Sequence, residues 1–469
     1  MNKERLKLRA LQIGKVSNDF ELEIEDFSEE HQVALFVWKS IHDAEQGIWI
    51  ELDSEGHLLH YNQYEAVLHH LLLQEEELLE KSLQFVSQYY PDALKTFVPE
   101  KSKTLSNGMR FSSVQMELGL PLEMTGFYVD VAFSGDILAF RYYGEAKDIR
   151  LPGEILDKEW VKQSFLAEVK MNLLITNLSS DVYENVSPSP RLVYQPNCPF
   201  YTHSADQIAE RNIENENEED YEISYLPLPE KLPGYPDIYK AIGFDKHALT
   251  KLREVDIGDE IVTVWHPAPP LSVNNDLSLD SYFQKKTENT LKIRTEKQTG
   301  KISGLFNFRD NKGLLSLSVE ECRTIALKFL YTLYPNADQY FRISSSNEDE
   351  EEETTQYGFH FSIFHRGIST HFGLCHITVN KTTGFITHYS APDIDVDRLE
   401  NIDVQPTLSE KEAKSLYLED LDFELIWNKN YEENQHEYHE LIYRVSFPKL
   451  NGDIHFINAH SGGKITAKM

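Results

Sequence analysis

Histidines are the residues of this chain whose types and spacing first suggest chemistry, because five of them fall within one short stretch. Imidazole nitrogens bind zinc and related ions, and a thiol, Cys375, lies beside one of these histidines. On β-strands, however, such ligands must occupy alternate positions or facing strands, and only the fold could bring them together. We therefore interpret them as surface and edge histidines. The five are His360, His365, His371, His376 and His388.

Three aspartates form a second candidate, a calcium-binding loop. Asp393, Asp395 and Asp397 have the spacing of the first ligands of such a loop. The loop then needs glycine at its sixth position and glutamate at its twelfth, where this chain has Arg398 and Val404. We expect a solvated segment between strands.

Other catalytic motifs do not support an assignment. The segment HEYHE resembles the zinc motif His-Glu-x-x-His, but His436 and His439 are one position too close. The sequence contains no Gly-x-Ser-x-Gly elbow, phosphate-binding glycine loop or dinucleotide fingerprint. Carboxylates are so abundant that the sequence cannot select an acid–base pair. We assign no catalytic, cofactor-binding or metal-ligating residue and predict no cofactor.

The chain contains two diverged copies of one domain. The stretch SLQFVSQYYPDA returns as ALKFLYTLYPNA, and Gly56 returns as Gly300 at the same spacing. Residues 13–38 also resemble residues 242–265. The first copy has no counterpart of the histidine cluster, which favours the surface interpretation. The duplication explains most glycine, tryptophan and helix-start positions as parts of the scaffold.

Helix starts are marked by capping boxes, in which two side chains satisfy each other's free backbone amides. Ser318 with Glu321 and Ser409 with Glu412 have this pattern. Tyr-Pro pairs end one helix in each copy, because proline disfavours helical backbone in the residue before it. The predicted core face of the first-copy helix consists of Leu79, Leu83, Val86 and Tyr90. We also expect four tryptophans in the core, namely Trp38, Trp49, Trp160 and Trp265.

Glycines mark the hairpins. Gly300, Gly384 and Gly462 each follow a polar residue by four positions, between β-branched or aromatic residues. Gly56 and Gly135 stand in similar places in the first copy. A short hairpin loop that closes with a bulge places one residue at positive φ, which glycine adopts without strain.

The order of these elements predicts an α+β fold of two pseudo-repeated domains, each an antiparallel sheet with helices packed on one face. We place the first repeat at residues 1–206 and the second at residues 237–469. Residues 207–236 are acidic and then rich in proline, which predicts a linker between two separately folding halves.

The net charge of −32 repels phosphate backbones and anionic lipid headgroups, so we predict neither a nucleic-acid nor a membrane partner. The charge either serves solubility or favours a protein or peptide partner with a basic surface. The sequence shows no signal-peptide core and no apolar stretch long enough to span a membrane. We expect a cytoplasmic protein, and the oligomeric state stays open.

The helix LSVEECRTIALKFL and the hairpin ITVNKTTGFI are similar to the PepSY pattern, and LSEKEAKSLYLEDL opens a second such unit. With the Ile-Gly…Val-Trp opening, the whole arrangement resembles the YcdB/YcdC repeated-domain proteins of spore-forming bacteria over nearly the full length. Asn380 and Asn458 stand where the PepSY hairpin usually has an acid. The resemblance implies a PepSY-like role as a protease inhibitor or chaperone, although such family members are commonly exported.

Three classes of function remain open at this point. The first is a non-enzymatic binding or regulatory protein, which the lack of a catalytic constellation favours. The alternative is a hydrolase with paired carboxylates in a cleft between the repeats. A structural or stress-related protein without a specific ligand is the third.

Overall fold

A computed structural model describes residues 3–43, 45–64, 72–184, 186, 189–206, 224–229, 231–267, 276–309, 312–345, 355–394, 396–432 and 436–468. Its sheets are mostly antiparallel and its helices pack against them, which confirms the predicted α+β class with two repeated domains.

The first repeat forms one antiparallel sheet with the strand order β1-β2-β3-β4-β11-β10-β7-β5, and β6 pairs with β7. Alternation in β2 sends Phe36 and Trp38 toward the helices, while Leu35 and Val37 face the other side. The helices of this repeat are α1 (Lys3–Gly14), α2 (Glu75–Tyr89) and α3 (Ala93–Thr96). Its strands are β1 (Phe20–Ser28), β2 (Val33–Ser40), β3 (Gly47–Asp53), β4 (Leu58–Tyr64), β5 (Val98–Pro99), β6 (Lys103–Thr104), β7 (Gly108–Val114), β10 (Gly126–Ala132) and β11 (Ile137–Gly144).

The second repeat reproduces this strand order as β17-β18-β19-β20-β24-β23, followed by β22, β21 and β16. The strand register repeats as well. Both β1 and β17 have a bulge that begins two residues after the first paired residue of the strand. The helices here are α5 (Ile238–Ala241), α6 (Leu279–Thr287), α7 (Val319–Leu333) and α8 (Ala337–Tyr340). The strands are β16 (Tyr225–Pro227), β17 (Leu249–Ile257), β18 (Glu260–Pro267), β19 (Leu291–Glu296), β20 (Ile302–Asn307), β21 (Phe341–Ser344), β22 (Gln356–His365), β23 (Ile368–Asn380) and β24 (Ile386–Ser390).

The ends of both repeats build a third unit together. β14 pairs with β27, β13 pairs with β23, and β26 pairs with β12 and β15 of the first copy. Its helices are α4 (Lys158–Glu168), α9 (Val396–Leu399) and α10 (Glu410–Leu418). Its strands are β12 (Ile149–Arg150), β13 (Lys170–Asn177), β14 (Pro190–Asn197), β15 (Thr202–Ser204), β25 (Asp422–Tyr431), β26 (Glu437–Ser446), β27 (Ile454–Asn458) and β28 (Lys464–Thr466), and the hairpin β8 (Met116–Glu117) and β9 (Leu120–Pro121) lies beside β25.

This interleaving crosses the boundary that the sequence predicts between separately folding halves. The sheet of the second repeat continues through β13 and β14, which precede residue 206 in the sequence. One hydrophobic core joins them, and within it Phe165 of α4 packs edge-on against Phe423 of β25 with ring centroids 5.5 Å apart. The first sheet has its own core, whose buried members lie between Leu6 and Phe140. The described part of residues 207–236 also contains β16, which pairs with β21.

The capping boxes form as predicted. Ser318 accepts a hydrogen bond from the Glu321 amide, and the Glu321 carboxylate accepts one from the Ser318 amide at 2.8 Å. The same exchange opens α10. The predicted core face of α2 is partly wrong, because Leu79 and Leu83 are exposed while Leu78 is fully buried. A run with adjacent leucines fits two helical stripes equally well, and the sheet beneath decides between them.

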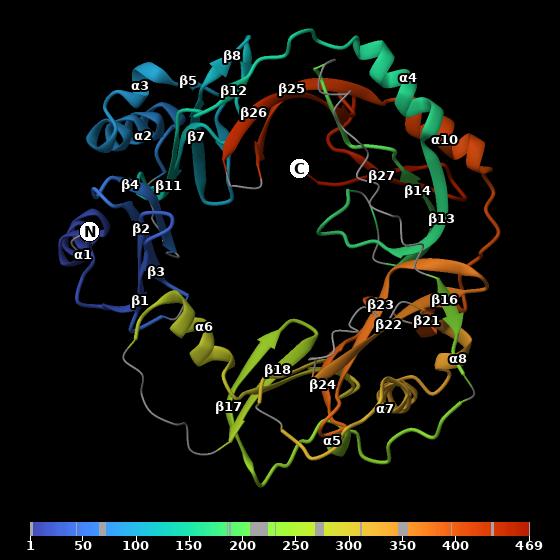
Figure 1. The fold of residues 1–469 in the computed structure, drawn as a ribbon. Helices are drawn as coiled ribbons and strands as arrows, with labels where there is room; N and C mark the ends of the chain where they lie inside the picture. Colours follow the sequence, from blue (N-terminus) through green and yellow to red (C-terminus); the bar gives the residue numbers. More distant parts are fainter. Residues whose placement is uncertain are drawn as a thin grey trace.

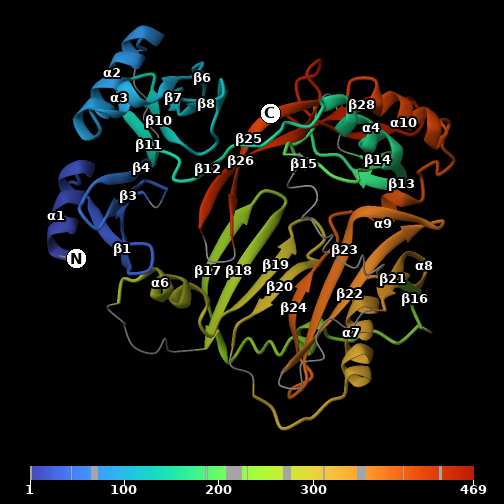
Figure 2. The same cartoon turned by 45° about the horizontal axis from the view of Figure 1, so that its top comes forward.

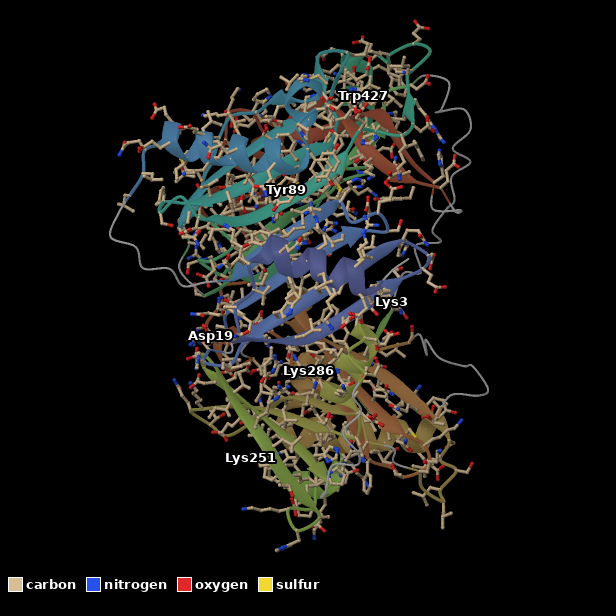
Figure 3. The ribbon with its side chains drawn as sticks, turned by 90° about the vertical axis from the view of Figure 1, so that its left-hand side faces the viewer. Lys3, Asp19, Tyr89, Lys251, Lys286 and Trp427 are labelled. Atoms are coloured by element: carbon tan, nitrogen blue, oxygen red, sulfur yellow. The ribbon has the colours of Figure 1, made fainter. Side chains whose placement is uncertain are left out.

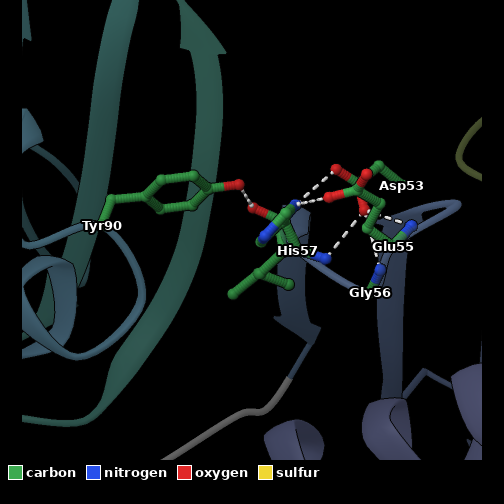
Figure 4. Close-up of polar contacts among 6 residues, drawn as sticks. Asp53, Glu55, Gly56, His57 and Tyr90 are labelled. Carbon is green, nitrogen blue, oxygen red and sulfur yellow. Dashed lines mark hydrogen bonds and ion pairs between the residues drawn. The ribbon is translucent and has the colours of Figure 1, made fainter.

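The hairpin glycines also have the predicted backbone, since Gly56, Gly135, Gly300, Gly384 and Gly462 all have positive φ. Figure 4 shows how the Gly56 turn is held. The Asp53 carboxylate accepts hydrogen bonds from the amides of Glu55, Gly56 and His57, and contacts the His57 ring at 2.7 Å. Asn380 and Asn458 hold their turns in the same way, so an amide replaces the usual acid without loss of the contact.

In Figure 1 the helices α1, α2, α4, α7 and α10 lie on the outer side of the sheets, and Figure 2 shows the same layering from a tilted view. Among the described residues, α6 packs on β1 of the first sheet. The β8–β9 hairpin makes a further contact, because the indole N–H of Trp427 donates to the Glu117 carbonyl at 3.0 Å. None of the described helices is long and apolar enough to cross a membrane.

Candidate functional site: the uncovered margin of the second repeat

Three of the five candidate histidines do lie together, on the face of the second sheet opposite α7. The rings of His360 and His376 stack with centroids 4.5 Å apart, and the Nδ1 atoms of His376 and His388 are 2.8 Å apart. One of these two nitrogens must therefore carry the proton that the other accepts. Burial lowers the pKa of His388, which favours its neutral form. Among the described residues, no three His, Cys, Asp or Glu side chains are arranged to hold a metal ion.

The other members of the cluster point elsewhere. Cys375 is fully buried on the helix side of β23, and burial raises the pKa of its thiol. His365 is buried beside Tyr340, and burial lowers its pKa. His371 contacts Phe456 of the third unit, and its pKa is lowered by burial and by nearby His455. Alternation along β23 separates Cys375 from its sequence neighbour His376.

The remaining sequence candidates are the aspartate triplet and the HEYHE segment. Asp393 is exposed, whereas Asp395 and the side chain of Asp397 lie outside the described residues. His436 lies 3.4 Å from the Asp148 carboxylate, while His439 is buried and contacts the Glu123 carbonyl through Nε2 at 2.8 Å. HEYHE is thus part of the junction around β26.

Two carboxylates, the buried Asp130 and the half-buried Glu51, lie on the face of the first sheet opposite the helices. Asp130 accepts two hydrogen bonds from Arg110, at 2.6 and 2.8 Å. Burial alone would raise the pKa of Glu51, but His60 and Arg141 more than offset it, and the pKa falls below its usual value. Every described carboxyl group with a resolved shift moves downward in this way. Such groups are ionised at neutral pH, which does not suit the general acid of a hydrolase.

A comparison of the repeats reveals a different site, where one repeat is covered and the other is not. In the first repeat, α1 lies across β2 and β3 and buries Leu6, Ala10 and Ile13 against them. The strand residues below it, including Phe36 and Trp38, are buried. Figure 3 shows α1, near Lys3, lying over the strands, whereas β17 with Lys251 runs along the margin of the molecule.

In the described residues 231–243 of the second repeat, the helix shrinks to the four residues of α5. Pro233 and Pro236 precede it, and each disfavours helical backbone in the residue before it. The chain runs along α7 instead, where the Tyr235 amide donates to the Thr332 hydroxyl at 2.7 Å. The strands β18 and β19 thus lack the cover that α1 gives to β2 and β3.

A groove of about 740 Å³ lies over these strands. Its wall contains Tyr239 and Phe244, with ring centroids 5.3 Å apart, and Phe244 packs edge-on against Trp265 at 4.9 Å. Its floor contains Thr263, Ile293 and Thr295, and Asp237 and Asp245 lie at its rim. Trp38 is buried in the core as predicted, whereas its counterpart Trp265 is only partly buried. Trp160 is also exposed.

The floor has changed along with its cover. Phe36 pairs with Ile50 across the first sheet, and the corresponding pair in the second is Thr263 with Ile293. Likewise Leu52, which pairs with Ala34, corresponds to Thr295, which pairs with Ile261. The groove therefore combines an apolar wall with hydroxyl groups that are already hydrogen-bonded within the sheet. The Trp265 indole N–H donates to the Thr263 hydroxyl at 3.1 Å, and the Thr295 hydroxyl donates to the Ile261 carbonyl at 3.4 Å.

The strand beside this groove, β17, is a sheet edge, and no other described strand pairs with its outer side. All its residues from Thr250 to Ile257 are exposed. The equivalent edge, β1, is occupied by the chain itself, because the Glu25 amide donates to the Leu277 carbonyl at 2.8 Å. There α6 places Leu279 and Tyr282 against a small apolar patch made of Ile24, Leu35 and Val37.

Sequence reasoning missed this margin, although two signals were present. The prolines before α5 mark the lost helix, and the exchange of Phe36 for Thr263 marks the altered floor. Recognising either signal required the register of the two repeats, which is set by the bulges in β1 and β17.

Comparison with known families agrees with this repeat structure. The family described as "YcdB, YcdC repeated domain" matches residues 3–144 and 247–393. The chain belongs to that family. The two matches coincide with the first sheet and with the second sheet from β17 to β24, whereas most of the third unit lies outside them.

The relatives are full-length matches without an assigned role. The "Uncharacterized protein YcdB" of Bacillus subtilis (strain 168) is 38% identical over 467 residues, covering 98% of this chain and 97% of the relative. The "Uncharacterized protein YcdC" of the same organism is 34% identical over 474 residues, covering 98% of each chain. The C-terminal domain of Bacillus megaterium YpeB gives a TM-score of 0.27 at 13% identity, covering 44% of this chain and 94% of that domain. That similarity is too low to place a site or a function.

Proposed function

We propose that this protein is a non-enzymatic binding protein that captures an extended segment of a partner by strand addition along β17. The observation that carries the proposal is the exposure of β17 from Thr250 to Ile257, at the edge of a large sheet. An edge strand offers unpaired N–H and C=O groups to an incoming strand. The equivalent edge in the first repeat, β1, already accepts a main-chain contact from the segment that leads into α6.

The side chains of β17 make such pairing selective. Lys251, Arg253, Glu254 and Asp256 carry charge, and charged edge strands resist indiscriminate pairing. Between them Leu252, Val255 and Ile257 expose apolar side chains. A partner must match both features. The net charge of −32 favours partners with basic surfaces, which would associate faster at low salt.

The class of partner follows by resemblance alone. PepSY-like units suggest a protease that is inhibited, or a client that is held extended, and both roles require the capture of an extended segment. The described cysteines Cys198, Cys322 and Cys375 are free thiols, the state that a reducing cytoplasm maintains, and we propose that location.

The test uses ten-residue peptides with alternating β-branched and basic residues, each compared with a version N-methylated at alternate amides. Strand addition predicts saturable binding that N-methylation abolishes, with protection of residues 249–257 from hydrogen exchange. Binding should weaken as salt rises from about 50 to about 500 mM, because the Debye length shrinks. Equal binding of methylated and unmethylated peptides would refute pairing through the backbone.

A pair of protein variants provides the matched control. Adjacent backbone amides of an edge strand point to opposite sides. One of the substitutions Glu254→Pro and Val255→Pro therefore removes an N–H that points away from the sheet, and the other removes an N–H that is hydrogen-bonded to β18. The variant that keeps the wild-type unfolding temperature should lose peptide binding. Full binding by that variant would contradict the proposal.

A further inference from the structure

We propose that the groove over β18 and β19 seats a basic amphipathic helix of a partner protein, in the place that α1 occupies in the first repeat. This inference goes beyond strand addition at β17 and does not depend on it. The two sites adjoin, because Thr263 and Trp265 in the groove belong to the strand that pairs with β17.

The first repeat shows what kind of helix fits this fold. The buried stripe of α1 consists of Leu6, Ala10 and Ile13. Its remaining surface is basic, although the chain as a whole is strongly acidic. The charged residues from residue 3 to 15 are Lys3, Glu4, Arg5, Lys7, Arg9 and Lys15. An apolar stripe with a basic border is a pattern that helix-in-groove partners commonly present.

The charges of α1 contact the margin of its own sheet. Lys7 forms an ion pair with Glu25 on β1, and the Lys3 amine lies 4.5 Å from the centre of the Phe27 ring. Register places Glu254 and Asp256 of β17 at the positions of Glu25 and Phe27. A helix in the groove would therefore meet the Glu254 carboxylate where α1 meets Glu25. It would meet the Asp256 carboxylate where α1 meets the Phe27 ring.

These two carboxylates already have lysine partners. Lys251 lies 2.9 Å from Glu254, and Lys297 lies 2.6 Å from Asp256. Exposed pairs of this kind contribute little to stability, so a basic side chain of a partner can replace them at small cost. Asp237 and Asp245 add acceptors at the opposite rim, next to Lys240 and Lys246.

The floor of the groove suits an occupant that binds reversibly. The strand residues below α1 are fully buried and apolar, as permanent cover requires. The groove keeps the partly buried Trp265 as an apolar anchor beside the buried Ile293. It has Thr263 and Thr295 in place of Phe36 and Leu52. Both hydroxyl groups are hydrogen-bonded within the sheet when the groove is empty, which limits the cost of exposing the floor.

The probe for this site is a fluorescein-labelled peptide with the sequence of residues 2–16, acetylated and amidated, titrated against the full chain by fluorescence anisotropy. We expect saturable binding that weakens with salt. One control peptide carries Leu6→Asp and Ile13→Asp, which remove the apolar stripe and lower the net charge by two. A second control carries Lys7→Gln and Arg9→Gln, which lower the net charge by the same amount and keep the stripe. The stripe model predicts that the second binds more tightly than the first.

Protein variants locate the binding. Tyr239→Ala removes an exposed wall residue, and Thr295→Arg fills the floor with a like charge. We expect each to weaken binding by about tenfold or more. Tyr431→Ala removes a similarly exposed tyrosine on β25 and should leave binding unchanged. Because the probe makes no strand pairing, failure of the β17 peptides leaves this test intact.

Hydrogen exchange separates the outcomes. Protection of residues 239–246 and 261–265 on peptide addition supports the groove. Protection or release at β2 and β3 would mean that the peptide exchanges with α1, and would overturn the proposal. Unchanged affinity in both Tyr239→Ala and Thr295→Arg would do the same. Concentration-dependent dimers that Thr295→Arg abolishes would assign the groove to a second copy of this chain instead of a partner.

Discussion

Removing the first 236 residues should unfold the remainder, because the second sheet continues into strands from the first copy. The fragment 237–469 lacks α4, β13 and β14, which contribute buried side chains to the shared core. Six of these are Val161, Phe165, Met171, Ile175, Leu192 and Tyr194.

The loss can be estimated from these side chains alone. At about 1.5 to 3 kcal/mol for each buried large side chain, six amount to about 9 to 18 kcal/mol. That range is comparable with the total stability of about 5 to 15 kcal/mol of an ordinary domain. The exposed partners would include Phe423, whose ring packs against Phe165. We therefore expect fragment 237–469 to lack a cooperative transition.

The assay is thermal unfolding followed by circular dichroism and calorimetry. Fragment 149–469 is the matched control, since it retains α4, β13 and β14, and it should unfold cooperatively. Fragment 3–144 should also fold alone, because its core is separate from the shared one. A single sharp transition with native near-ultraviolet signal in fragment 237–469 would refute the argument from interleaved strands.

Two further predictions concern single residues. Gly384→Val should lower the free energy of unfolding by about 1 to 3 kcal/mol, because Gly384 has a φ of 71° that β-branched residues adopt only with strain. Unfolding in urea measures this change. A difference within error would show that the turn tolerates valine. The hydrogen bond from Lys429 lowers the pKa of Glu437 to about 2, against burial and with help from Lys147. Its folded pKa is depressed, so the stabilisation is present above the unfolded value of 4.5 and is lost as pH falls toward 2. Glu437→Gln should flatten the fall in stability between these values, and an unchanged acid profile would contradict the assignment.

Much of the fold could be predicted because its signals are local. A capping box such as Ser318 with Glu321 acts within one helical turn, and a hairpin glycine such as Gly384 acts within one loop. Where two local solutions were equally good, prediction failed, as for Leu78 and Leu79 on α2. Trp160 was expected in the core and is exposed, because α4 buries Val161 and Phe165 instead.

The candidate histidines show the same limit. His360, His376 and His388 come from three strands, and their contact depends on cross-strand register and a bulge that no local pattern encodes. The uncovered groove was equally hidden. The prolines before α5 are visible in the sequence, but only alignment of the two sheets shows that a helix is missing above Trp265.

By itself the sequence determined the duplication, the α+β class, the helix caps and the turn glycines, since each depends on residues close together in the chain. Tertiary structure alone decided which strands neighbour one another across the two copies. Strand pairing joins residues far apart in sequence, as when β14 meets β27, and its energy comes from backbone groups that every residue shares. For the same reason only the folded chain shows that the first repeat is covered by α1 and α6 while the margin of the second is open.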